Sequence, residues 1–84
     1  MKKVDNVAFT TTAIEGNNYI LFSWYTGARG YAKVCRADSY EYATAFAGGW
    51  GYDKRGAAVS KALKKLGIDR DENFADKLSW RTVL

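Results

Sequence analysis

Alternating hydrophobic and polar positions in the first half of the chain predict β-strands. Residues 7–14 and 19–26 are rich in β-branched and aromatic side chains, and the polar segment 15–18 lies between them. Two such runs joined by a short polar segment are typical of a β-hairpin. Asn17 and Asn18 tolerate the positive φ angles of a tight turn, so we expect the turn at these two residues.

The segment 19–26 has large hydrophobic side chains at both even and odd positions. One set is Ile20, Phe22 and Trp24, and the other is Tyr19, Leu21 and Tyr25. Because successive side chains of a strand point to opposite faces, this pattern predicts a central strand that is covered on both sides.

Two further strands are expected before residue 48. Residues 27–30 form a turn into a strand at 31–36, and residues 40–46 alternate strictly after a turn at Asp38-Ser39. The alanines of 40–46 also fit a helix, which remains the alternative, but the alternation favours a strand. Sequential neighbours usually pair, so we expect a four-strand antiparallel meander.

The hydrophobic period changes to that of an α-helix over residues 54–66. The expected buried stripe is Ala58, Val59, Ala62, Leu63 and Leu66, with Ser60, Lys61, Lys64 and Lys65 pointing away. Asp53 is a suitable N-cap, Gly67 suits a left-handed residue after the last turn, and Ile68 is placed to close back on Leu63. This helix is expected to cover one face of the sheet.

The remaining residues predict smaller elements. Residues 71–78 suit a short helix with acids in its first turn, and residues 79–84 suit a final strand. No proline, linker or internal repeat interrupts the chain. We therefore expect one α+β domain over residues 1–84, an antiparallel sheet of about four strands packed on one main helix.

The composition supports a folded chain whose core is small. Of the 84 residues, 48% are hydrophobic and 15% are aromatic, and a domain of this size buries only about 60 to 65% of the surface of its unfolded chain. We therefore expect the aromatic side chains to supply much of the core.

The single cysteine bears on the cellular compartment in which the protein is expected. Cys35 has no intramolecular disulfide partner, and small secreted domains usually contain several disulfides. No apolar stretch follows the N-terminal lysines, and the longest apolar run is too short to span a bilayer. We expect a cytoplasmic protein with no membrane partner, in which Cys35 is a small core residue.

The available side chains argue against catalysis. Histidine is absent, which removes the commonest general base, and one cysteine provides no zinc-binding set. The acidic residues of 69–72 are typical of a solvated helix start. We expect no enzyme activity, no catalytic residues, no metal and no cofactor.

A glycine-rich run before the helix is the first candidate site. Lys54 and Arg55 follow it in the first helical turn, where each cation costs about 0.3–1 kcal/mol but an anion would be bound by backbone N–H groups. The candidate binding residues, for an anion or a partner, are Gly49, Gly51, Tyr52, Lys54, Arg55 and Lys61. The glycine spacing matches neither the Walker A motif nor the Rossmann fingerprint. The alternative is that these residues form a simple strand-to-helix turn followed by a solvated lysine face.

A second candidate surface combines cations and aromatic residues. The formal charge is +4, and three cations lie in the predicted turn and strand at 27–36, close to aromatic positions: Arg29, Lys33 and Arg36. Aromatic side chains on an open sheet face next to cations can stack on nucleic-acid bases. Packing in the core is the alternative use of the same rings.

Residues 47–63 resemble a Gly-x-Gly-Tyr-Asp-Lys segment followed by an alanine-rich helix in small uncharacterised phage and prophage proteins. The resemblance implies a mobile-element origin, and phage proteins of this size often inhibit host defences, as anti-CRISPR proteins do. We therefore expect an inhibitor that contacts a host defence protein complex in the host cytoplasm. The alternative is a nucleic-acid or nucleotide-binding module that uses the glycine-rich turn and the basic helix, and a structural virion protein is a minor alternative. The sequence leaves open whether the protein forms a homodimer through a sheet edge.

Overall fold

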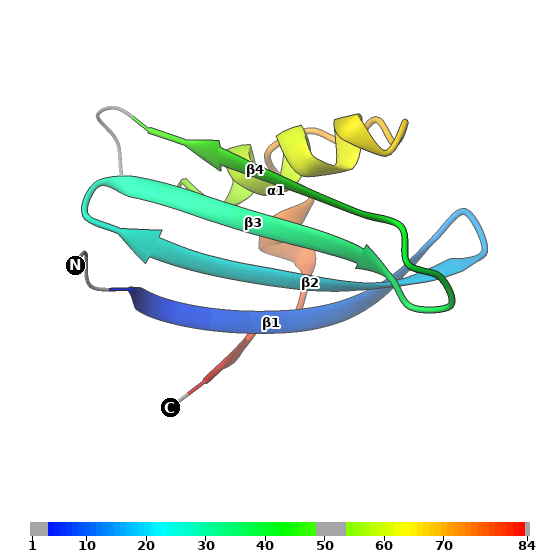
Figure 1. Cartoon of the computed structure of the whole chain (residues 1–84), viewed down its shortest axis with the longest axis horizontal. Coiled ribbons are helices and arrows are strands. Elements are labelled where there is room, and N and C mark those ends of the chain that lie inside the picture. Colours follow the sequence, from blue (N-terminus) through cyan, green and yellow to red (C-terminus); the bar gives the residue numbers. More distant parts are fainter. Residues whose placement is uncertain (1–3, 49–53, 84) are drawn as a thin grey trace.

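The computed structural model describes residues 4–48 and 54–83 and confirms the predicted α+β class. One antiparallel sheet lies in front of a single α-helix in Figure 1. The strands are β1 (Asp5–Ile14), β2 (Asn17–Thr26), β3 (Arg29–Arg36), β4 (Tyr42–Ala47) and β5 (Arg81–Thr82), and the helices are α1 (Arg55–Lys65) and the 3₁₀ turn η1 (Ala75–Lys77).

The strand order β4-β3-β2-β1-β5 contains the predicted four-strand meander. Residues 40–46 were the ambiguous segment, and β4 confirms the strand. The predicted final strand is also confirmed: β5 pairs with β1 through Phe9 and Arg81, and the Val83 N–H donates to the Val7 carbonyl at 2.7 Å.

The predicted short helix over 71–78 is present as 3₁₀ structure rather than as an α-helix: η1 covers Ala75–Lys77, and the bonds of the segment join each N–H to the carbonyl three residues earlier. The Asn73 N–H donates to the Asp71 carboxylate at 2.9 Å, which is a local turn rather than a helical bond. The indole N–H of Trp80 donates to the Ala75 carbonyl at 2.9 Å. Leu78 is already extended, with φ −95° and ψ 153°. Local side-chain hydrogen bonds at both ends of this segment therefore accompany 3₁₀ turns in place of an α-helix.

The β1–β2 turn lies two residues before the predicted position. Glu15 and Gly16 have the positive φ angles, 52° and 83°, and Ile14 pairs directly with Asn17. Two positive φ angles fit a tight two-residue hairpin turn. This register places both Ile14 and Tyr19 in the core, whereas a one-residue slip would move one strand's core side chains to solvent.

The C-terminal end of α1 is as predicted. Gly67 has φ +80°, its N–H donates to the Lys64 carbonyl, and the Ile68 N–H donates to the Leu63 carbonyl, both at 3.0 Å. This is the Schellman arrangement. At the other end Lys54 is the N-cap, with no side-chain cap hydrogen bond. The predicted cap, Asp53, lies outside the described residues.

The core contradicts the expectation that aromatic rings would fill it. It is formed by Ile14, Tyr19, Leu21, Ala32, Val34, Ala45, Ala47, Ala58, Val59, Ala62, Leu63, Ile68 and Ala75. Among the residues that the structure describes, Tyr19 is the one aromatic member of this cluster, while Phe74 and Trp80 pack at its margin. Alanines of α1 lie against alanines of β3 and β4, so helix and sheet approach closely and leave no space for rings.

Two glycines mark the closest approaches. A side chain at Gly30 would collide with Lys54 at the start of α1, and a side chain at Gly56 would collide with the backbone carbonyl of Glu72. Glycine is therefore required at these contacts for steric reasons.

The expectation that β2 is covered on both sides is also wrong. Helix α1 covers one face, and within residues 4–48 and 54–83 no element covers the other (Figure 1). Phe22, Tyr42 and Phe46 on that second face are 36%, 60% and 51% exposed. Cys35 pairs with Tyr42 and Ile20 on the same face and is half-buried, so it is not the core residue that was expected.

Gly56→Ala provides a test of the tight helix packing. Alanine normally stabilises a helix interior by about 1 kcal/mol relative to glycine. Because the added Cβ would collide with the Glu72 carbonyl, we expect a net loss of about 1–3 kcal/mol in unfolding free energy, measured by urea denaturation. Gly48→Ala, whose Cβ would make only ordinary contacts with Arg29, is the control; a stabilised Gly56→Ala protein would contradict the packing.

Candidate binding surface on the open sheet face

The uncovered face of the sheet gathers the exposed aromatic side chains. We call it the open face and define it by the strand register as Phe9, Thr11, Ile20, Phe22, Trp24, Arg29, Tyr31, Lys33, Cys35, Tyr42, Thr44, Phe46 and Arg81. None of these residues is acidic. The open face is therefore both aromatic and cationic.

Three rings form a row across neighbouring strands. Trp24 of β2 pairs with Tyr31 of β3, and Tyr31 pairs with Phe46 of β4. The Trp24 and Tyr31 centroids are 5.6 Å apart with planes within 2°, and the Tyr31 and Phe46 centroids are 5.9 Å apart at 40°. We call these three side chains the aromatic row; their edges and faces stabilise one another outside the core.

Cations lie over and beside the rings. The guanidinium carbon of Arg29 is 4.8 Å from the Phe46 centroid, and the Lys33 ammonium is 4.8 Å from the Tyr42 centroid. Each contact contributes about 0.5–1 kcal/mol at an exposed site. Arg81 of β5 lies beside Phe9 at the opposite edge of the sheet. The open face thus carries positive charge across its width.

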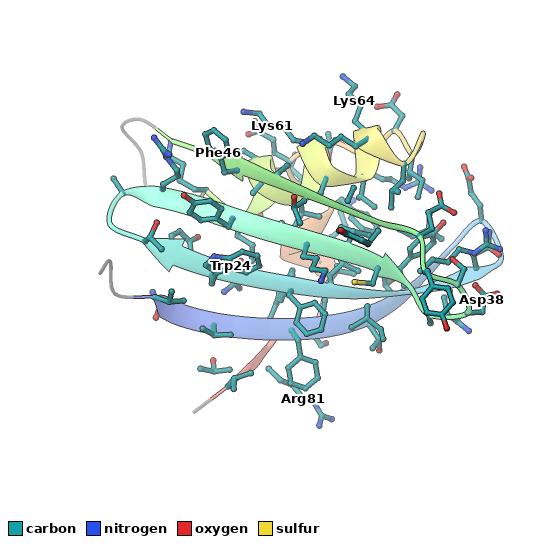
Figure 2. All side chains as sticks on the ribbon, in the orientation of Figure 1. Trp24, Asp38, Phe46, Lys61, Lys64 and Arg81 are labelled. Carbon is teal, nitrogen blue, oxygen red and sulfur yellow. The ribbon has the colours of Figure 1, made fainter. Side chains whose placement is uncertain are left out.

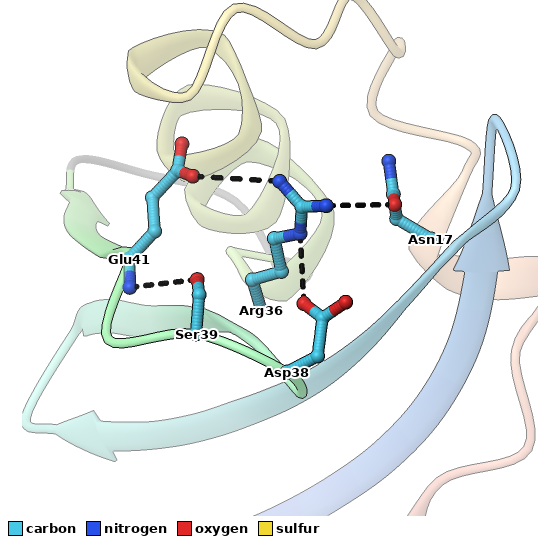
Figure 3. Close-up of polar contacts among 5 residues, drawn as sticks. All are labelled: Asn17, Arg36, Asp38, Ser39 and Glu41. Carbon is cyan, nitrogen blue, oxygen red and sulfur yellow. Dashed lines mark hydrogen bonds and ion pairs between the residues drawn. The ribbon is translucent and has the colours of Figure 1, made fainter.

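The sequence grouped Arg36 with Arg29 and Lys33, but the structure separates it. Arg36 lies at the β3–β4 turn, where its Nε is 2.9 Å from Asp38 and its Nη1 3.9 Å from Glu41 (Figure 3). A third nitrogen, Nη2, donates to the Asn17 side-chain carbonyl at 2.9 Å. Through these contacts Arg36 links the β3–β4 turn to the β1–β2 turn. Figure 2 shows Asp38 at the end of the strands away from Trp24 and Phe46.

The candidate residues at the helix start attach α1 to the sheet. The Arg55 side chain donates from Nε to Ser23 Oγ at 3.1 Å, and its guanidinium carbon is 4.6 Å from the Trp80 ring centroid. The Arg55 backbone N–H donates to the Tyr25 hydroxyl at 3.2 Å. Lys54 packs on Gly30. The other predicted members of this site, Gly49, Gly51 and Tyr52, lie outside the described residues.

Lys61 lies elsewhere, at the outer edge of the sheet. Its ammonium is 3.4 Å from the Phe46 carbonyl, and the Lys65 ammonium is 2.7 Å from the Thr44 carbonyl. Both lysines thus occupy the hydrogen-bonding edge of β4, a common protection of edge strands against pairing with another chain. The predicted homodimer stays a prediction, and this edge does not favour it.

The sequence contained a signal for the open face that the prediction did not use. In β4 the alanines Ala43, Ala45 and Ala47 alternate with Tyr42, Thr44 and Phe46. Small residues on one side indicate the face against which a helix packs closely. The aromatic residues of the other side are then left for solvent or a ligand.

Two further properties of the described residues bear on the site. Nowhere in residues 4–48 and 54–83 do three histidine, cysteine, aspartate or glutamate side chains gather as a metal site would require. In the same part of the chain, no helix combines the length and apolar character needed to cross a membrane.

Comparison of the chain with protein-family models, curated proteins and solved structures finds no significant match.

Arg55→Ala tests the structural use of this cation. The helix dipole alone predicts that removal of the Arg55 cation raises the unfolding free energy by about 0.3–1 kcal/mol. Because the side chain holds Ser23 and Trp80, we expect instead a loss of about 1–2 kcal/mol in unfolding free energy, measured by chemical denaturation. Lys64→Ala on the exposed side of α1 is the control, with a change within about 0.5 kcal/mol; a stabilised Arg55→Ala protein would restore the anion-site interpretation.

Proposed function

We propose that the protein binds single-stranded nucleic acid on the open face. The observation that carries this proposal is the aromatic row, which stands outside the core with cations at both sides and with no acid on the face. This differs in location from the glycine-rich turn predicted from the sequence.

The chemistry of the face matches that of an unpaired strand. Every base has a π-face, so bases stack on aromatic side chains with little regard to sequence, each for about 1–3 kcal/mol. Arg29 and Lys33, which lie over Phe46 and Tyr42, are positioned to contact phosphates beside the stacked bases. Arg81 adds positive charge at the β5 edge of the face. Duplexes keep their bases paired and stacked internally, so this face favours single strands.

The charge distribution also favours one part of the face. Asp38 and Glu41 lie at the β3–β4 turn, and Glu15 lies at the β1–β2 turn. Figure 1 shows both turns at the same end of the sheet, and Figure 2 shows Asp38 at that end, away from Trp24 and Phe46. Phosphates are repelled there and attracted near Arg29, so the strand is expected to run across the β-strands along the aromatic row.

A second candidate is docking on a host defence protein complex, the phage-type inhibitor expected from the sequence. Tyrosine, tryptophan and arginine are the residue types that dominate protein interfaces, and the open face exposes all three. This candidate would use the same surface in the host cytoplasm, so the partner class must be separated by experiment.

Phe46→Ala tests the proposed surface. Removing the terminal ring of the aromatic row should weaken binding of a fluorescein-labelled dT12 oligonucleotide by about 5- to 150-fold in fluorescence anisotropy at 50 mM NaCl. Tyr40→Ala is the matched control, because Tyr40 is a fully exposed aromatic residue at the β3–β4 turn. Equal affinities of the two variants, or no binding of dT12 or rU12 by the native chain, would refute the proposal.

Salt separates the two candidates. Contacts of at least three cations with phosphates give a slope of about −2 or steeper in log affinity against log salt, so affinity for dT12 should fall at least about twentyfold between 50 and 200 mM NaCl. A protein partner held by the aromatic residues should be captured at both salt concentrations. Capture from host lysate that survives nuclease and 200 mM NaCl, together with absence of oligonucleotide binding, would favour the inhibitor.

A further inference from the structure

A groove runs along the outer edge of the sheet between β4 and α1. It has a volume of about 480 Å³ and is lined by Ala45, Phe46, Lys61, Lys64 and Lys65. Of the described residues that line it, three are lysines and none is acidic. In Figure 2, Lys61 and Lys64 of α1 lie beyond Phe46, on the side away from Trp24.

The lysines retain capacity to bind an anion. Lys61 and Lys65 each use one hydrogen bond on a carbonyl of β4, and an ammonium has three donors. These bonds also fix the two ammonium groups beside the groove. Lys64 is exposed on the same helix one turn after Lys61.

Phe46 connects this groove with the open face. Its ring ends the aromatic row and lies under Arg29, and the same residue lines the groove. A chain stacked on Trp24, Tyr31 and Phe46 therefore meets the lysines directly after the last ring. Among residues 4–48 and 54–83, the other edge has a single cation, Arg81, in the depression formed with Phe9, Thr10, Thr11 and Ser79.

We infer that single-stranded nucleic acid crosses the β4 edge and places its next phosphates in the groove of Lys61, Lys64 and Lys65. This inference rests on the proposed function and extends it. It gives the bound strand a direction across the sheet, from β2 to β4 and then onto α1. It also divides binding into a stacking part and a phosphate part.

Oligonucleotide length tests the path. dT4 is long enough for the aromatic row alone, whereas dT12 also reaches the groove. The variant to compare is the double substitution Lys61→Ala/Lys64→Ala, which leaves Lys65 in place on the β4 edge. We expect this double variant to bind dT4 like the native chain, but to lose affinity for dT12. Its salt slope with dT12 should fall by about 1.4, corresponding to two phosphates on a single strand.

The control is Lys77→Ala, which removes an exposed lysine of η1 outside the groove and should change neither affinity nor slope. Unchanged dT12 binding by the double variant, or equal losses for both lengths, would overturn the path while leaving the proposed function standing. If the native chain binds neither oligonucleotide, the proposed function and this inference fail together. Thermal unfolding of each variant verifies that the fold is retained.

Discussion

The fold depends on the close contact between α1 and the sheet through small side chains. Ala58 and Ala62 of the helix lie in the same buried cluster as Ala32, Ala45 and Ala47 of the sheet. Such an interface has little volume between its layers, so it favours small side chains and rejects rings. Tyr19 and Tyr25 of β2 lie on the helix side, outside this alanine contact, whereas the other aromatic residues of β2, β3 and β4 are placed on the opposite face: Phe22, Trp24, Tyr31, Tyr42 and Phe46. The aromatic surface is thus a geometric result of how the helix packs.

Rings outside the core need other means to hold their positions. Trp24 and Tyr31 are stacked within 2° of parallel, and Arg29 and Lys33 lie over Phe46 and Tyr42. These contacts pre-order the side chains, which lowers the entropy that a ligand would have to remove on binding. A contiguous exposed aromatic patch also promotes unspecific association. The cations on the face counter this by adding charge among the rings.

The sequence predicted the elements well and their environments less well. Alternation and helical period located four strands, the main helix and its Gly67 terminus, because these depend on local preferences. The choice of covered face could not be read from β2, since Leu21 and Phe22 are equally apolar and only the position of α1 decides between them. The turn at Glu15-Gly16 was missed because asparagines favour the same backbone region, while the pairing of Ile14 with Asn17 is a property of the whole sheet. Arg36 and Arg55 were assigned to surfaces, but their partners come from segments remote in sequence, such as Asn17 and Trp80.

The placement of β5 beside β1 has a consequence for how the chain folds. The meander of β1 to β4 and the packing of α1 on β3 and β4 join segments that are near one another in sequence. In contrast, the edge of β1 that faces away from β2 is covered by residues distant in sequence. The Ser79 carbonyl, for example, accepts a hydrogen bond from the Thr10 hydroxyl, 69 positions earlier in the chain. Contacts of such separation form late because of their loop-closure entropy. During synthesis on the ribosome, β1 therefore keeps one bare hydrogen-bonding side until most of the chain has emerged, and it is the strand most open to wrong partners in that interval.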